Sequence, residues 1–151
     1  MRENGEGKAG EYESEKGEGG KGEMERDNGR GNERWTYEVI GALIVVHREL
    51  GPGFIESVYH RAVEIELGHR GIPFESEVDI DLSYRGRPIG KHRMDLIIDG
   101  QLVVELKAVE ELNRKHYAQV RSYLKATGNR VGLLANFSEF QLDPRRVELK
   151  H

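Results

Sequence analysis

The first patterned segment of the chain places apolar side chains three or four positions apart, which is typical of an amphipathic helix. Thr36 is suited to cap the start of this helix, and Trp35 before it can pack against Ile40. Gly-Pro-Gly at positions 51–53 ends the helix, and a second helical pattern runs from about Ile55 to Leu67. The apolar positions of the first helix are Val39, Ile40, Leu43, Ile44, Val46 and Leu50.

Alternation replaces the helical spacing in the middle of the chain. Apolar and polar residues alternate from Ser76 to Tyr84, which predicts a strand with one face in water. A turn at positions 85–88 leads to a second strand that ends in the apolar run 94–98. Asp99-Gly100 is a strong hairpin signal, and a third strand lies within residues 101–109. The second and third strands are nearly continuously apolar, so we expect them at the centre of a sheet.

The last predicted elements are a helix and a strand that together form a crossover. Asn113 is a possible helix cap, and Gly128 is positioned to stop the helix after Thr127. Residues 130–137 read as a fourth strand, which should pair parallel to the third through a right-handed connection. Residues 138–151 carry no clear pattern. The predicted order is ααβββαβ, an α/β domain built on a small mixed sheet.

Composition separates a polar tail from this domain. The chain has 151 residues and a net charge of −4. Residues 1–33 hold ten acidic and six basic side chains, which accounts for all of this charge, and almost no apolar residues. Such a segment cannot bury enough surface to offset its ordering entropy, so we predict a disordered tail over 1–33 and a domain over 34–151. The domain itself is neutral, which gives no global electrostatic argument for nucleic-acid binding.

Cysteine usage and hydropathy indicate the compartment. The chain has no cysteine, which excludes disulfides and thiolate metal sites. No apolar run approaches the ~20 residues that span a bilayer, and the N-terminus lacks the apolar core of a secretory signal. We therefore expect a soluble cytoplasmic protein without membrane contact.

Two charges interrupt the third predicted strand. Glu105 and Lys107 are two positions apart, so their side chains lie on one face of an otherwise apolar segment. An acid two residues before a lysine occurs three times in this chain, and only this instance lies on an apolar strand. Burying such charges is costly unless they are paired or bind a metal. One explanation is structural, either an internal Glu–Lys ion pair or an edge face open to water, and a functional site is the other.

Asp95, on the neighbouring predicted strand, decides between these explanations through the register of the hairpin. A two-residue Asp99-Gly100 turn would place Asp95 opposite Val104 and turn it away from Glu105. A three-residue loop over 98–100, with Gly100 as the bulge, would place Asp95 opposite Val103 and on the face of Glu105. The functional interpretation requires this bulge or an equivalent one upstream.

If these side chains converge, they form a site for a hard divalent cation. Two carboxylates and the Leu106 carbonyl suit Mg²⁺ (or Mn²⁺), which takes further ligands from water and a substrate phosphate. Such an ion polarises a phosphoryl oxygen and lowers the pKa of bound water. Lys107 would orient that water, help to deprotonate it or stabilise the charge at phosphorus.

Two helices carry further polar candidates. Glu56, Tyr59 and His60 share one face of the second helix through i, i+3 and i+4 spacing, although a solvated face would show the same pattern. Gln119 and Tyr123 are spaced i, i+4 on the third helix, where partly buried amphipathic residues are the alternative.

The motifs together resemble a known family. Residues 53–59 read Gly-x-x-Glu-x-x-Tyr, and with "VHRELGPG", "ELKAV", "AQVRSYLKATG" and "VGLLANF" the chain looks like a GxxExxY protein. This family is placed in the PD-(D/E)XK nuclease superfamily, with a restriction-endonuclease-like fold. The resemblance spans about Tyr37 to Arg146. It implies a divalent-metal-dependent nuclease that acts on DNA or RNA, although some superfamily members have lost catalysis.

The resemblance also assigns roles to single residues. It implies that Asp95 is the metal-binding aspartate and that Glu105 with Lys107 is the (D/E)XK element. Glu56 matches a carboxylate that the core helix adds to the metal site. Gln119 and Tyr123 look like the Q-x-x-x-Y element of the RecB-like branch. The proline of the superfamily name is replaced by Met94.

Local basic clusters offer a surface for a nucleic-acid partner. They lie on the second strand with its turn and on the third helix, although ordinary solvated side chains are an equal alternative. A non-catalytic module that binds nucleic acid or protein on the same fold is the second functional hypothesis. The sequence specifies neither DNA over RNA nor an oligomeric state. The clusters comprise Arg85, Arg87, Lys91, His92 and Arg93 on the strand, and Arg114, Lys115, Arg121 and Lys125 on the helix.

Overall fold

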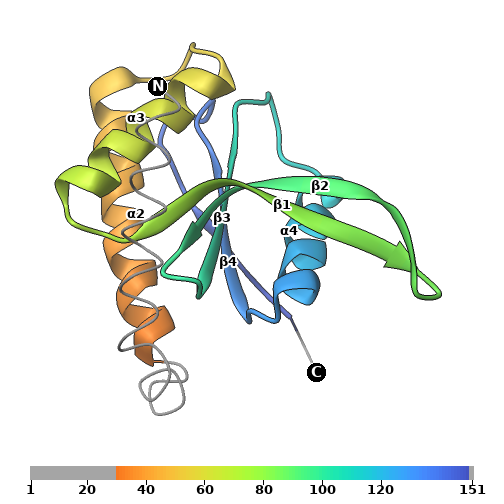
Figure 1. Ribbon diagram of the computed structural model, residues 1–151. Coiled ribbons are helices and arrows are strands. Elements are labelled where there is room, and N and C mark those ends of the chain that lie inside the picture. The colour runs from red at the N-terminus through yellow and green to blue at the C-terminus, as the bar shows by residue number, and fades with distance from the viewer. Residues whose placement is uncertain (1–29, 150–151) are drawn as a thin grey trace.

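A five-stranded mixed sheet with helices on both faces forms the described part of the chain, residues 30–149 of a computed structural model (Figure 1). The strands lie in sequence order, β1-β2-β3-β4-β5. This architecture confirms the predicted restriction-endonuclease-like α/β class. The elements are α2 (Arg30–Leu50), α3 (Glu56–His69), β1 (Phe74–Tyr84), β2 (Arg87–Ile98), β3 (Leu102–Lys107), α4 (Arg114–Thr127), β4 (Val131–Asn136) and β5 (Arg145–Glu148).

The first helix starts earlier than its apolar pattern indicates. It begins at Arg30, inside the segment predicted as a tail, and residues 1–29 of that segment lie outside the described residues. Thr36 is therefore inside the helix and does not cap it, and its buried hydroxyl finds no partner among the described residues. The Trp35 indole instead donates a hydrogen bond to Asp99 at 3.1 Å. None of the helices within residues 30–149 is long and apolar enough to cross a membrane.

The crossover from β3 to β4 forms as predicted. Asn113 caps α4 by accepting hydrogen bonds from the N–H groups of Lys115 and His116, at 2.9 and 3.4 Å. Gly128 ends the helix in a left-handed conformation with φ 78°. Strands β3 and β4 pair parallel, which confirms the prediction. The sequence signals missed β5, which pairs antiparallel to β4 at the edge of the sheet.

Each face of the sheet has its own apolar cluster. Helices α2 and α3 pack on one face, where Leu102, Val104 and Leu106 of β3 are buried. Helix α4 covers the other face, where Val103 of β3 and Leu134 of β4 are buried (Figure 1). Strand β3 is thus buried on both sides, as its continuous apolar sequence predicts.

The hairpin between β2 and β3 has a register that the sequence did not fix. Its three-residue loop is 99–101, with Asp99 and Gly100 at positive φ, and the Gln101 N–H donates to the Ile98 carbonyl at 2.8 Å. Ile98 therefore pairs with Leu102, and the ladder continues to Leu96 opposite Val104. The expected loop at 98–100 is wrong by one residue, and the expected partner of Asp95, Val103, is therefore wrong by two. A shift of two preserves the face, so the requirement that Asp95 share the face of Glu105 is met.

Strand β2 is central over only part of its length. It pairs with β3 over Leu96–Ile98, whereas it pairs with β1 from Arg87 to Ile98. Residues 87–93 are exposed, so the prediction of a strand buried on both faces holds only for the apolar segment from Met94 onward. The remainder of β2 projects with β1 as a two-stranded ribbon (Figure 1).

Candidate metal centre

Asp95 and Glu105 form a buried carboxylate pair on β2 and β3. Leu96 pairs with Val104, so Asp95, one residue before Leu96, stands opposite Glu105, one residue after Val104. The Asp95 N–H lies 3.4 Å from Glu105 Oε1, and the Leu106 N–H donates to Asp95 Oδ2 at 2.8 Å. Glu105 is only 3% exposed. Two acids are therefore held side by side where water has little access.

Burial makes this pair resist full ionisation. Desolvation raises the pKa of Glu105 to about 8, the Asp95 carboxylate adds to the rise, and Lys107 partly opposes it. Desolvation also raises the pKa of Asp95, against the Leu106 N–H, His60 and Lys107. The neighbouring side chains supply too little positive charge for two carboxylates. A divalent cation would supply it, and hard oxygen donors are the ligands that Mg²⁺ prefers. The donor set fits such an ion.

Lys107 lies at the end of β3 on the same face. Its Nζ is 3.8 Å from Glu105 Oε2, and its side chain is 16% exposed. The strand end is fixed because the Lys107 carbonyl accepts the Phe137 N–H at 2.8 Å. Buried Asn136 then clamps both backbone groups of Val109, at 3.0 and 2.8 Å. The ammonium therefore stands at the boundary between the carboxylate pair and solvent.

Helix α3 contributes Glu56 to this region. Glu56 is the first residue of the helix and is partly buried. Desolvation raises its pKa, Asp95 raises it further, and Lys107 and His60 lower it. Glu56 thus lies within the electrostatic field of the predicted site.

Tyr59 has a packing position instead. It is fully buried, its hydroxyl donates to the Gly51 carbonyl at 2.5 Å and accepts the Phe54 N–H at 3.1 Å. Its ring stacks on Phe137 with centroids 4.6 Å apart. These contacts close the loop that leads into α3, and so they fix the start of the helix where Glu56 stands.

Helix α4 brings Gln119 and Tyr123 to the opposite side of the pair. Tyr123 is buried, and its hydroxyl donates to the Arg93 carbonyl at 3.3 Å. Desolvation raises the pKa of Tyr123, as do the charges of Glu105 and Asp95, while a hydrogen bond with Gln119 lowers it. The spacing i, i+4 therefore does place both side chains together beside the acids.

His60 stands between α3, β1 and Asp95 in a network that sequence patterns only partly revealed. Its Nδ1 is 3.9 Å from Asp95 Oδ1. Its Nε2 is 2.8 Å from Ser76 Oγ and 3.2 Å from Glu64 Oε2. The Ser76 hydroxyl donates to Glu64, so Ser76 Oγ can only accept from His60, which places a proton on Nε2 and turns Nδ1 toward Asp95.

Glu64 anchors this network as a carboxylate. Although desolvation raises its pKa, hydrogen bonds from His60, Ser76 and Arg61 lower it to about 2. The sequence patterns pointed to neither Glu64 nor Ser76. Glu64 lies four residues after His60 on α3, so helical spacing is the signal that could have found it, whereas the place of Ser76 follows from the contact between α3 and β1.

Glu77 is a further acid that the sequence did not single out. It lies between the pairs Ser76–Leu96 and Val78–Met94, and thus opposite Asp95. Its backbone is left-handed, with φ 55°. The Asp95 pKa, raised first by burial, is raised further by Glu77.

The four arginine and lysine residues predicted on the hairpin divide into two that form ion pairs and two that do not. Arg93 contacts Asp79 at 2.9 Å and Lys91 contacts Asp81 at 3.7 Å, across the two strands. Arg85 and Arg87 have no ion-pair partner within the described part of the chain. The acids of β1 therefore neutralise two of these four charges, because Asp79 and Asp81 stand directly opposite Arg93 and Lys91 and share a face of the ribbon with them.

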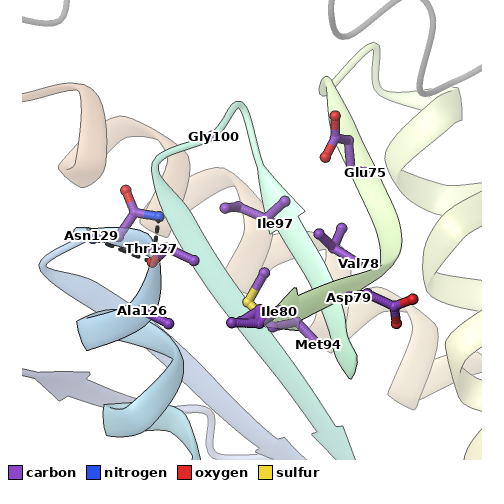
Figure 2. A pocket seen from close by; sticks show the side chains of 10 residues that line it. All are labelled: Glu75, Val78, Asp79, Ile80, Met94, Ile97, Gly100, Ala126, Thr127 and Asn129. Carbon is purple, nitrogen blue, oxygen red and sulfur yellow. Dashed lines mark hydrogen bonds between the residues drawn. The ribbon is translucent and has the colours of Figure 1, made fainter. Parts of the chain in front are cut away.

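A hollow near this hairpin is separate from the acids. It lies between the hairpin and the C-terminal end of α4, and Val78, Met94, Ile97 and Thr127 are among its lining residues (Figure 2). None of the predicted site residues lines it.

Within residues 30–149, no three histidine, aspartate or glutamate side chains are grouped so as to hold a metal ion as they stand. Asp95 is directed at a backbone N–H and Glu105 faces Lys107, so metal binding would require these carboxylates to turn.

Comparison with known proteins agrees with this fold. Residues 33–147 match the sequence profile of the PD-(D/E)XK nuclease superfamily. Among curated proteins, none matches the chain. The crystal structure of SSO0001 is similar with a TM-score of 0.52 and 20% sequence identity, over 63% of this chain and 50% of that one. The similarity covers half of that protein and concerns the fold alone.

Proposed function

Because the chain belongs to the PD-(D/E)XK nuclease superfamily, we propose that it is a divalent-metal-dependent nuclease that hydrolyses phosphodiester bonds of DNA or RNA. The observation that carries this proposal is the buried Asp95–Glu105 pair with Lys107 at its edge. We take these three side chains to be the acid and lysine positions of the superfamily motif, and burial leaves the pair short of positive charge.

Four groups of this chain are suited to hold the ion, which we take to be Mg²⁺ or Mn²⁺. Asp95 and Glu105 would provide the central carboxylates, with the Leu106 carbonyl and Glu56 as further oxygen donors. His60 presents Nδ1 on the same side, with its other nitrogen held by Glu64 and Ser76 as in metal sites with an ordered outer shell. When bound, the ion would lower the pKa of a coordinated water and polarise the phosphoryl oxygen.

Lys107 would act on the attacking water or on the phosphate. Its ammonium lies 3.8 Å from Glu105 and reaches solvent, where a phosphodiester would arrive. In that position it neutralises charge that develops on the phosphoryl oxygens, or orients the water for attack. Tyr123 supports the site from α4 through the Arg93 carbonyl, and Gln119 holds Tyr123 by a hydrogen bond.

We further assign the chain to the GxxExxY family and to the RecB-like branch of the superfamily. The Gly53, Glu56 and Tyr59 spacing supports the first assignment, because Tyr59 braces the turn from which Glu56 enters the site. The Gln119 and Tyr123 pair beside the acids supports the second.

A non-catalytic binding module is the second candidate. One observation favours it: Asp95 Oδ2 already accepts the Leu106 N–H, and Glu105 already faces Lys107. Such contacts can stabilise the charges without an ion. Binding by this module would survive Glu105→Gln and would need no divalent cation.

Cleavage assays with matched variants distinguish these candidates. DNA and RNA, single- and double-stranded, are incubated with Mg²⁺ or Mn²⁺ and wild type, Asp95→Asn, Lys107→Ala or Asp143→Asn. Asp143 is an exposed loop carboxylate and serves as the control. We expect at least ~100-fold loss of cleavage in the first two variants, which is the scale of positioned acid–base groups. Wild-type cleavage that persists in either variant would overturn the site assignment.

A further inference from the structure

A two-stranded ribbon, residues 78–94, extends from the metal centre beyond the sheet (Figure 1). The described pairing of β2 with β3 covers only Leu96 to Ile98. On the N-terminal side of Leu96, β2 continues to pair with β1 as far as Arg87 opposite Tyr84. An isolated two-stranded ribbon is only marginally stable in water. The base of the ribbon, Val78, Ile80 and Met94, packs in the apolar cluster beneath α4, whereas residues 83–93 are exposed, so the outer part contributes little to the core and is accessible to a partner.

The charge of the ribbon is concentrated at its tip. Along the stem, Asp79 pairs with Arg93 and Asp81 pairs with Lys91 across the strands. At the tip, Arg85 and Arg87 are exposed and lack ion pairs among the described residues. The stem is therefore electrically neutral, and the positive charge of the ribbon lies at its tip. A cationic tip that projects from the domain is complementary to a polyanion.

The tip also exposes apolar surface. Tyr84 and Ile89 are each 65% exposed. Ile89 is the extra residue of a bulge, since Gly90 pairs with Leu82 and Pro88 pairs with Ser83. A bulge bends a ribbon and increases its twist. Apolar and cationic side chains therefore share a curved tip.

The ribbon is joined rigidly to the proposed catalytic site. Asp95 follows directly after Met94 on the same strand, and Tyr123 of α4 donates to the Arg93 carbonyl at 3.3 Å. The His92 ring packs edge-on against Tyr123 with centroids 5.9 Å apart. From Asp95 to Arg87 the strand extends roughly 26 Å at ~3.3 Å per residue.

We propose that this ribbon enters the major groove of B-form duplex DNA and places Arg85 and Arg87 on phosphates about 8 base pairs from the phosphate that a metal ion at Asp95 and Glu105 would hold. The major groove of B-form DNA admits a two-stranded ribbon, whereas the deep and narrow major groove of an RNA duplex does not. The proposal rests on the proposed function in one respect, because the distance is counted from the metal centre.

Binding without metal separates this proposal from catalysis. The full chain is titrated in EDTA against fluorescent duplex DNA, the same sequence as single strand, and the RNA duplex, with anisotropy as the readout. The Arg85→Ala/Arg87→Ala variant is compared with Arg48→Ala/Arg130→Ala, which removes two exposed arginines outside the ribbon. Thermal melts by circular dichroism verify that all variants are folded.

We expect the ribbon variant to lose ~10-fold or more in affinity for duplex DNA, while the control keeps the wild-type affinity. The slope of log affinity against log salt should fall in magnitude by about 1.8, as expected for two lost phosphate contacts. Wild-type affinity should drop for duplexes too short to extend ~8 base pairs to one side of the site. Equal affinity of ribbon variant and wild type, or tighter wild-type binding to the single strand or the RNA duplex, would overturn the proposal.

The two proposals fail in different ways. A chain that cleaves nucleic acid through Asp95 but binds duplex DNA independently of Arg85 and Arg87 refutes the ribbon assignment and leaves the nuclease standing. A chain that binds duplex DNA through these arginines and never cleaves supports the ribbon and refutes the nuclease.

Discussion

Asp95 and Glu105 stand opposite each other on adjacent strands, with the Asp95 N–H 3.4 Å from the Glu105 carboxylate. Each belongs to an apolar stretch of sequence, and the fold brings them together by the register of one hairpin. The cost of holding two acids in this position is visible in their raised pKa values. The consequences can be measured without knowledge of the substrate.

Glu105 should make the metal-free protein less stable as pH rises. The pKa of Glu105 is raised from its ordinary 4.5 to about 8, first by desolvation and then by Asp95. Between these pH values the folded chain retains a proton that the unfolded chain has released, so the free energy of unfolding falls as pH increases. Glu105→Gln removes this dependence and should be the more stable protein at pH above 8, by up to a few kcal/mol.

The measurement is urea unfolding of both proteins from pH 5 to pH 9 in EDTA. The difference between the two curves isolates Glu105, because His60, whose pKa is raised through Glu64 and Asp95 against desolvation, titrates in both proteins. If the free energy of unfolding changed with pH equally in both proteins, the pKa of Glu105 would not be raised in the folded chain, and the prediction would fail.

Tyr59→Phe should destabilise the fold while its ring packing is retained. The change leaves the Gly51 carbonyl and the Phe54 N–H without their partner, and because both hydrogen bonds are only partly buried the expected cost is about 0.5–1.5 kcal/mol. Tyr37→Phe is the control, because Tyr37 is 82% exposed and should be neutral. Equal unfolding midpoints for the two variants in urea would contradict the bracing role of the Tyr59 hydroxyl.

Gly132→Ala should destabilise the protein by disturbing the packing of α4 on the sheet. An added Cβ would lie 2.8 Å from Val120 Cγ1 and 3.2 Å from the Val103 carbonyl oxygen, which forces the helix or the strand to move. Overpacking of this kind costs about 1–3 kcal/mol. The matched change Gly41→Ala meets only the end of the Arg70 side chain, at 3.3 Å, and improves helix propensity by up to about 1 kcal/mol. Opposite shifts of the thermal midpoint are therefore expected, and a stabilising Gly132→Ala would contradict the packing.

The sequence predicted elements well where local signals define them. The Asn113 cap and the Gly128 stop bound α4 correctly, and the long apolar run of β3 identified a strand buried on both faces. It failed where tertiary contacts decide. The turn from Arg30 to Glu33 has no apolar pattern, and Glu33 is instead paired with Arg146 at 3.1 Å. Strand β5 buries only Val147, so it has no alternation to recognise.

The same limit applies to the site. Asp95, Glu105 and Lys107 were selected because charge on apolar strands needs a reason, but their common face depended on one extra loop residue, Gln101. Ser76 meets His60 only through the packing of α3 on β1, which no spacing within the chain encodes, whereas Glu64 lies four residues after His60 on α3, a helical spacing that the sequence does contain.

The most direct test of the metal centre is calorimetric titration of Mn²⁺ into the full chain, beside Asp95→Asn and the control Asp143→Asn. Each titration is repeated with a non-cleavable oligonucleotide, because such ions often complete their shell with a phosphate oxygen. We predict binding in wild type and in Asp143→Asn, and its loss in Asp95→Asn at unchanged fold. Identical isotherms for all three proteins, with and without the oligonucleotide, would contradict a metal at Asp95 and Glu105.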